Sequence, residues 1–193
     1  VIKAIGELGY KISVQVITAS DYGVPQKRRR VFFFGSKEGF FELRASQDSR
    51  IVTCKDAISD LPDYSLDTGQ QYPMAVSSSY QNLMRSKSDG VWNHVLTNHS
   101  EKTKEIIALV PDGGNYKDLP TQLQGTRKDN IAWTRYSSDK PSFTIDTGHR
   151  HHFHYDYNRI PTVRENARLQ SFADDFIFLG TKTSQYIQVC NAV

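Results

Sequence analysis

The chain has 193 residues, of which 38% are hydrophobic, and a formal net charge of +3. This length can bury a core and suits one domain or two small ones. The sequence contains no run of about 18 apolar residues, which excludes a helix that spans a membrane. The first residues do not follow the pattern of a signal peptide, and the two cysteines lack metal-ligand spacing. We therefore expect a cytoplasmic protein.

Positive charge is concentrated near the beginning of the chain. Residues 1–55 contain 10 Lys and Arg against 5 Asp and Glu, a net of +5, whereas residues 56–163 contain 11 against 13, a net of −2. Residues 164–193 are balanced, with 3 of each sign. Because the middle segment begins with acidic residues and carries most of its arginines late, only its later part suits contact with a nucleic acid.

The first elements alternate between helix and strand. Apolar residues at helical spacing predict a helix over 2–8, which Gly9 would end. Alternation with a period near two predicts a strand over 12–17, and the apolar run at 31–34 is typical of a strand covered on both faces. This order fits the late part of an open, doubly wound, Rossmann-like α/β sheet, in which ligands gather at strand ends.

Between about residues 56 and 160 the pattern is broken by prolines and glycines. We expect short strands, one helix over 100–110, a tight loop at 111–115 and a short strand at 143–145. Such a segment suits a small, irregular, mainly β module whose loops recognise a ligand. Thr162 and Glu165 have the spacing of a capping box, which begins the next helix.

Residues 21–30 read Asp-Tyr-Gly-Val-Pro-Gln-Lys-Arg-Arg-Arg. Pro25 and the glycine before it favour an extended or looped backbone, in which alternate side chains share a face. Gln26, Arg28 and Arg30 then point to one side, and the two cations between them point to the other. Two interpretations of this charged run stay open. It forms a face that binds a polyanion together with a carbonyl oxygen, or it is an ordinary solvated edge or generic phosphate binder.

A group of histidines near residue 150 raises the question of a metal site. Its members are His149, His151, His152 and His154. Imidazole clusters bind zinc, but no cysteine or acidic residue completes a recognisable ligand spacing here, since Asp156 alone is weak support. We favour a loop whose imidazoles contact DNA or water, and we expect no metal.

Three blocks, in this order, carry a resemblance to a known family: residues 21–30 before a hydrophobic strand, residues 162–176 and residues 185–193. They resemble the DNA (cytosine-5) methyltransferases, which place Asp-Tyr-Gly-Val-Pro-Gln-x-Arg-x-Arg before a strand. The blocks cover both ends of the chain, and the segment between them looks like the target-recognition region of that family. The resemblance implies a C-terminal part of the catalytic domain at 1–55, a target-recognition domain at 56–163 and a return to the catalytic domain at 164–193.

Other motifs of the family are not found in this sequence. Its glycine-rich cofactor loop, its Pro-Cys nucleophile and its Glu-Asn-Val motif would all lie upstream of Val1. Neither Cys54 nor Cys190 follows a proline, so neither matches the nucleophile. We therefore expect the C-terminal part of a methyltransferase, either as a fragment of a longer polypeptide or as one half of a divided enzyme. The missing N-terminal catalytic half is then its partner.

The resemblance also implies a chemistry. The family adds a cysteine thiolate to carbon 6 of cytosine and methylates carbon 5 with S-adenosylmethionine. An arginine donates to the exocyclic oxygen of the ring as negative charge develops. By resemblance this arginine is Arg30, with Arg28 beside it holding a backbone phosphate or the catalytic loop. Gln26 is expected to fix the turn and to contact DNA. Asn191 and Ala192 match the final loop that helps hold the cofactor.

Cys190 stands where the family usually has glycine. If the glycine is needed for a positive φ, the loop would be strained, whereas if it is needed only for close packing, a small thiol would fit. The cofactor contact depends on which of these holds.

The substrate of the family is a cytosine in duplex DNA, which must be flipped out of the stack to be reached. Arg127, Arg135 and Arg150 are our candidates for DNA contacts in the middle segment, each weighed against an ordinary exposed arginine. The leading hypothesis is a bacterial DNA (cytosine-5) methyltransferase of a restriction-modification system. The alternative is a catalytically silent DNA-binding or specificity subunit. A basic RNA-binding fold has little support, because the aromatic platform motifs of single-strand readers are missing.

Overall fold

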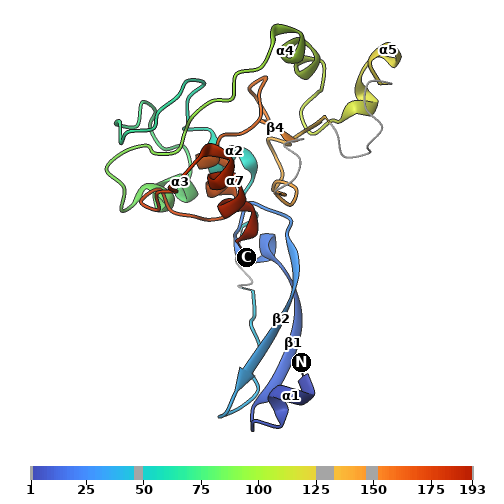
Figure 1. Ribbon diagram of the computed structural model, residues 1–193, viewed down its shortest axis with the longest axis vertical. Helices are drawn as coiled ribbons and strands as arrows, with labels where there is room; N and C mark the ends of the chain where they lie inside the picture. The colour runs from blue at the N-terminus through green and yellow to red at the C-terminus, as the bar shows by residue number, and fades with distance from the viewer. Residues whose placement is uncertain (1, 46–49, 125–132, 147–151, 193) are drawn as a thin grey trace.

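The computed structural model describes residues 2–45, 50–124, 133–146 and 152–192. Figure 1 shows a two-stranded arm, formed by the first part of the chain, that projects from a larger head formed by the rest. The head consists mainly of helices and irregular loops, and the helix near the C-terminus lies close to the base of the arm. In the described ranges no helix is both long and apolar enough to cross a membrane.

The arm begins with helix α1 (Ile2–Gly6) and continues with strands β1 (Lys11–Thr18) and β2 (Arg29–Ser36). The strands pair antiparallel, with a register that runs from Lys11 opposite Ser36 to Thr18 opposite Arg29. Gly9 has φ +82 just after the helix, where few side chains are tolerated. Both strands are therefore confirmed. The predicted helix is present but ends at Gly6, two residues before its predicted end, and Gly9 closes the turn that follows it.

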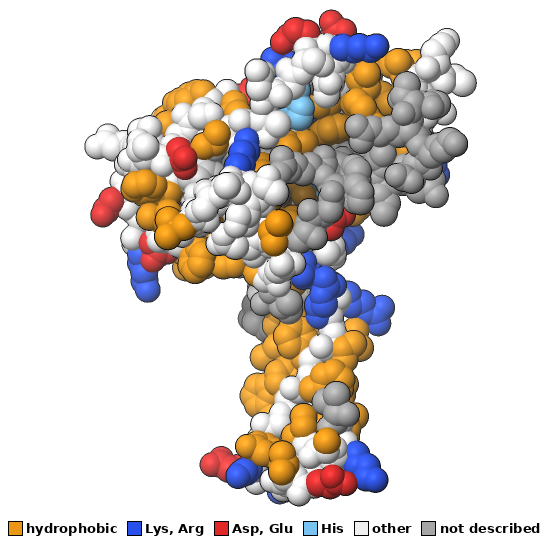
Figure 2. Space-filling view, viewed as in Figure 1, with side chains coloured by type: hydrophobic (Ala, Val, Ile, Leu, Met, Phe, Trp, Pro, Cys, Tyr) orange, Lys and Arg blue, Asp and Glu red, His pale blue; other side chains and the backbone are white. Residues whose placement is uncertain are grey.

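One face of the arm is apolar and exposed to solvent. Val14 pairs with Phe33 and Val16 pairs with Val31, so these four side chains point to the same side. Their exposed fractions lie between 44% and 54%. The prediction that residues 31–34 are covered on both faces is wrong for this structure, because no described element packs on this side. Figure 2 shows the apolar side chains along the arm.

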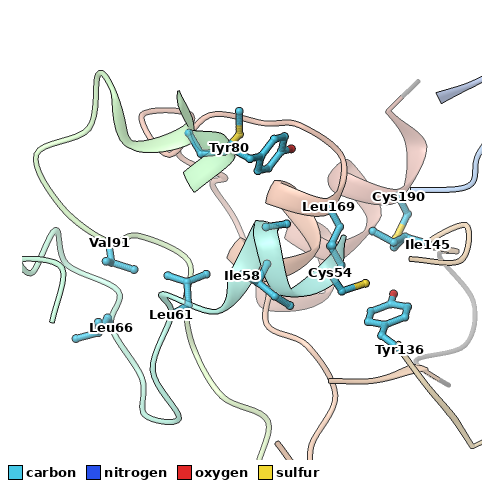
Figure 3. Close-up of a cluster of buried hydrophobic side chains, with 12 residues drawn as sticks. Cys54, Ile58, Leu61, Leu66, Tyr80, Val91, Tyr136, Ile145, Leu169 and Cys190 are labelled. Atoms are coloured by element: carbon cyan, nitrogen blue, oxygen red, sulfur yellow. The ribbon is translucent and has the colours of Figure 1, made fainter. Parts of the chain in front are cut away.

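The core of the head is built around helix α6 (Val163–Leu169), all of whose residues are buried. Helices α2 (Cys54–Ile58) and α7 (Lys182–Asn191) pack against it, and α3 (Ser79–Arg85) packs against α2. Figure 3 shows the apolar cluster between them. The predicted capping box is confirmed: Thr162 Oγ1 accepts from the Glu165 amide at 3.2 Å, and the Thr162 amide donates to the Glu165 carboxylate at 2.7 Å.

Helix α6 also buries charged side chains, which are paired. The Arg168 guanidinium donates to both carboxylate oxygens of Asp174, at 2.9 and 2.6 Å, and binds Asp60 as well. Arg159, just before the helix, makes a bidentate pair with Glu165 at 2.8 Å for each bond. These pairs hold the pKa values of Asp174 and Glu165 below their usual range, despite burial.

The middle of the chain is more helical than predicted. It contains α4 (Glu101–Ala108), the short helices η2 (Tyr116–Asp118) and α5 (Thr121–Gln124), and the two-residue parallel strands β3 (Thr134–Arg135) and β4 (His152–Phe153). The predicted helix over 100–110 is confirmed, and its N-cap is Ser100. The expectation of a mainly β module is wrong for the described residues, and residues 143–145 form no strand.

Candidate functional site

Residues 25–30, which we call the arginine segment, follow the 3-10 helix η1 (Ala19–Tyr22) at the base of the arm and run into β2, which begins at Arg29. Their side chains alternate as predicted: Gln26 is fully buried, Arg28 is 7% exposed, and Lys27 and Arg29 are exposed. The side-chain amide of Gln26 donates through Nε2 to the carbonyl of Leu169, at the end of α6, at 3.3 Å. The inward face of this segment is therefore inserted into the head and is not a solvated edge.

Arg28 connects two other segments of the chain. Its guanidinium donates to the Cys190 carbonyl at 3.1 Å and to the Ile145 carbonyl at 3.4 Å. Burial lowers the pKa of Arg28, and the positive charge of Arg30 lowers it further. The guanidinium of Arg28 thus holds two other parts of the chain beside the arginine segment. These are the C-terminal end of α7 and residues 142–146.

The backbone of residues 142–146 runs along the arginine segment. Gln26 and Ser142 form a parallel bridge, in which the Lys27 amide donates to the Ser142 carbonyl at 2.8 Å and the Ser142 amide donates to the Pro25 carbonyl at 2.9 Å. Thr144 Oγ1 donates to the Lys27 carbonyl at 3.0 Å. No sequence motif signalled this contact, because it joins residues more than one hundred positions apart.

Arg30 lies at the start of β2, opposite Ile17, and is half-buried. Its guanidinium donates to the carbonyl of its neighbour Arg29 at 2.8 Å. Unlike Arg28, it makes no side-chain hydrogen bond or ion pair with the described residues of the head. Arg30 therefore has a charged group at the junction of arm and head that is only partly enclosed by this chain.

Cys190 lies in the last turn of α7, where it is 4% exposed and contacts the Asp146 carbonyl through its sulfur at 3.0 Å. Its φ is not positive, so the strain considered for a replaced glycine does not arise. The thiol packs in the core beside Ile145 (Figure 3). Asn191 ends the helix with an exposed side chain, and Ala192 is its C-cap residue.

Of the three arginines predicted to contact DNA in the middle segment, the structure describes one. Arg127 and Arg150 lie outside the described residues. Arg135 is 4% exposed, and its guanidinium donates to the carbonyls of Ile107 and Val110 at 2.7 Å each. Further bonds reach the carbonyls of His154 and Tyr157 and the side chain of Asn158. These contacts favour a structural role, in which Arg135 holds the end of α4 against β4, over an exposed cation.

Of the four histidines, His149 and His151 lie outside the described residues. The ring of His152 stacks with those of Tyr136 and Phe143. His154 is 1% exposed, and its Nδ1 accepts from the amides of residues 156 and 157; burial lowers its pKa to about 4. In the part of the chain that the structure covers, no three His, Cys, Asp or Glu side chains are grouped as metal ligands.

The fold belongs to a class of known structures. It matches the crystal structure of an Escherichia coli protein named as a prophage-encoded DNA modification methyltransferase, with a TM-score of 0.75 and 24% sequence identity. The match covers 100% of this chain and 59% of that chain. At this identity the likeness shows a mixed α/β fold shared with part of that protein.

The sequence then gives the family. Residues 1–193 match the C-5 cytosine-specific DNA methylase model, so the chain belongs to this family, which uses S-adenosylmethionine. The chain is 39% identical to the Type II methyltransferase M1.HphI of Haemophilus parahaemolyticus, covering 96% of this chain and 45% of that protein. It is 34% identical to M.DdeI of Desulfomicrobium norvegicum, covering 96% and 52%. The chain therefore spans about half the length of these relatives, which are Type II enzymes of restriction-modification systems.

Proposed function

We propose that this chain is the C-terminal part of a bacterial DNA (cytosine-5) methyltransferase of a restriction-modification system. It would act on a cytosine flipped out of a specific duplex site, together with a part that carries the nucleophilic cysteine. The observation that carries the proposal is the junction around residues 26–28. There the arginine segment, residues 142–146 and the end of α7 are joined by hydrogen bonds from Gln26 and Arg28.

Arg30 would donate to the exocyclic oxygen of the flipped cytosine. Negative charge develops on the ring during thiolate addition, and a fixed guanidinium stabilises this charge in a site that excludes water. Arginine suits the role because its planar donors remain charged at any working pH. The partial exposure of Arg30 at the junction supports the assignment, since its charge can still face a substrate.

Arg28 would position the site and not touch the base. Its Nη donors already bind the Ile145 and Cys190 carbonyls, so they are not directed at a phosphate. Gln26 would act in the same way through Leu169. This interpretation refines the expectation that Arg28 and Gln26 contact DNA: they hold the recognition segment and the C-terminal helix in register with Arg30.

The end of α7 would contribute to cofactor binding. The exposed side-chain amide of Asn191 can donate a hydrogen bond to S-adenosylmethionine or accept one from it. The small side chain of Ala192 lets the cofactor approach the backbone closely. The cofactor supplies the methyl group. Because the Cys190 carbonyl anchors this end of the helix to Arg28, the cofactor contact and the arginine segment are held as one unit.

The apolar face of the arm would pack against the rest of the catalytic domain. A two-stranded ribbon with one bare apolar face is marginally stable by itself. The relatives are about twice as long as this chain, which leaves enough polypeptide to cover the face. We propose that β1 and β2 complete the late part of a doubly wound sheet, with residues 56–163 as the target-recognition domain and residues 164–193 returning to the catalytic domain.

A catalytically silent specificity subunit is the second candidate. Both cysteines are buried, and burial raises the pKa of Cys54 well above its usual value, so this chain by itself supplies no accessible thiolate, as both candidates require. Mixing this chain with a polypeptide that supplies the other half, and measuring methyl transfer from labelled S-adenosylmethionine to duplex DNA, separates the two. Activity that requires both parts supports the enzyme. DNA binding without methyl transfer by any such pair supports the silent subunit.

A further inference from the structure

Three stacked rings, those of Tyr136, His152 and Phe143, have no role in the proposed function. Tyr136 is 1% exposed and belongs to the core of the head. The ring of His152 stacks on it, with centroids 5.3 Å apart and an interplanar angle of 17°. The ring of Phe143 stacks with His152 at 5.6 Å and 21°. Phe143 is 46% exposed, so the set begins in the core and ends with a supported phenyl ring at the surface.

Phe143 and His152 line a groove with a volume of about 510 Å³. This volume lies within the range of about 300–1,000 Å³ that small-ligand sites occupy. The rest of the lining is polar or small and includes one cation and one carboxylate; it consists of Gly113, Asn115, Lys117, Thr134, Thr144 and Asp146. A groove with a flat aromatic ring, a lysine, a carboxylate and several polar groups is suited to a ligand that has a π face, hydrogen-bonding edges and a negative charge placed near the lysine.

The groove is fixed to the proposed site by residues 142–146. Ser142 and Ile145 are buried against the arginine segment, whereas Phe143, Thr144 and Asp146 face the groove. Thr144 also donates to the Lys27 carbonyl, and the side chains of Lys27 and Arg29 are exposed on the outer face of that segment. Figure 2 shows Lys and Arg side chains gathered where the arm meets the head. A polyanion that approaches Arg30 would therefore pass near the groove.

We propose that this groove binds a nucleobase of the DNA substrate, stacked on Phe143, with a backbone phosphate near Lys117. The inference rests on the proposed function, because it places a further base of the same duplex beside the flipped cytosine. A phenyl ring offers a base no hydrogen bond, so Phe143 contributes stacking, and any preference among bases comes from the polar lining. Tyr136 and His152 hold the ring in place, which reduces the conformational entropy lost on binding.

The test uses the active methyltransferase, reconstituted with its other half, after sequencing of the DNA that it methylates has identified the site. Duplexes that carry 5-iodouracil at each position of the site and its flanks in turn are bound and irradiated, because iodouracil cross-links to aromatic side chains that stack on it. We expect the cross-linked peptide to contain Phe143. Cross-links that map only to other aromatic residues, at every position tried, overturn the proposal.

A set of variants gives an independent measurement. Stacking of one base is worth at least about a fivefold change in affinity, so Phe143→Leu is expected to raise the Kd for the specific duplex by that factor or more. Phe143→Tyr retains the ring and is expected to bind as the unchanged protein does. Phe176→Leu is the matched control, because Phe176 is an exposed phenyl (50%) that does not line the groove.

The outcomes separate the two proposals. If the unchanged protein methylates DNA and the Phe143→Leu variant binds and methylates DNA equally well, the proposal of a base-binding groove is wrong. The proposal that the protein is a methyltransferase is then still supported. An unchanged protein that neither methylates nor binds any DNA overturns the proposed function itself.

Discussion

Arg28 and Arg30 are two positions apart, and the structure gives their guanidinium groups different surroundings. Arg28 is buried against the carbonyls of Ile145 and Cys190, whereas Arg30 is half-exposed at the start of β2. A buried guanidinium that satisfies carbonyls from two distant segments acts as a connector. A partly exposed one retains donors for a substrate. The two residues should therefore affect different kinetic constants.

We predict that Arg30→Ala lowers kcat by about 100-fold or more, as removal of a charge-stabilising donor does, with smaller changes in KM. Arg28→Lys should instead raise KM for both DNA and S-adenosylmethionine, because a single ammonium cannot hold two carbonyls in a fixed geometry. Steady-state kinetics on the complete methyltransferase measure both. Arg29→Lys, at an exposed neighbouring position, is the control. Equal effects of the Arg28 and Arg30 variants on kcat alone would contradict the division of roles.

His154 predicts a pH dependence of stability. Burial lowers its pKa from 6.5 to about 4, so the unfolded chain binds more protons between these values. Above about pH 6.5 His154 therefore does not change the free energy of unfolding. As the pH falls below this value, His154 lowers the free energy of unfolding, by about 2 kcal/mol at pH 5. In His154→Asn, whose side-chain oxygen can still accept from the backbone amides, urea unfolding should lose this part of the slope. An equal loss of stability on acidification in both proteins would contradict it.

At the scale of the elements, local patterns were sufficient for some predictions and not for others. The period-two alternation of 12–17, the turn at Gly9 and the capping box of Thr162 depend on neighbouring residues, so the sequence predicts them. The burial of Arg135 and the pairing of Gln26 with Ser142 depend on contacts between distant segments. A single sequence does not show such contacts. The alternation of residues 26–30 was predicted correctly, but which groups the inward face would bind was not.

Helix α6 depends on its buried charge pairs. Removing one partner of a buried pair leaves a charge in the core that is no longer fully compensated, and leaving it unpaired costs about 3–5 kcal/mol. We predict a loss near the lower end of this range for Arg168→Ala, because Asp60 and Asp174 both lose Arg168 but keep Arg85 and Arg164 as partners. Arg44→Ala, in an exposed pair with Glu42, should change stability by less than about 1 kcal/mol. Urea denaturation compares the two, and similar losses in both variants would argue against a structural role for the buried network.

At the scale of the whole molecule, the chain has two unequal parts. The head encloses clusters of buried side chains, whereas the arm leaves one apolar face bare. The relatives are about twice as long as this chain. Under the proposed function, the bare face and the incompletely enclosed Arg30 have one explanation, because the other half of the catalytic domain would complete both. The proposed active site is then a property of the assembled protein and not of this chain alone.

This explanation predicts that a charge on the bare face prevents assembly. Val16→Asp places a carboxylate among apolar side chains that are to be buried, which costs several kcal/mol if it stays charged. We expect it to abolish complementation by the other half, measured as methyl transfer on mixing, and to weaken the complex by at least about tenfold in a binding assay. Leu83→Asp is the control, because Leu83 is 60% exposed on α3 in the head. Full activity of the Val16→Asp protein would show that this face of β1 and β2 remains exposed in the assembled enzyme.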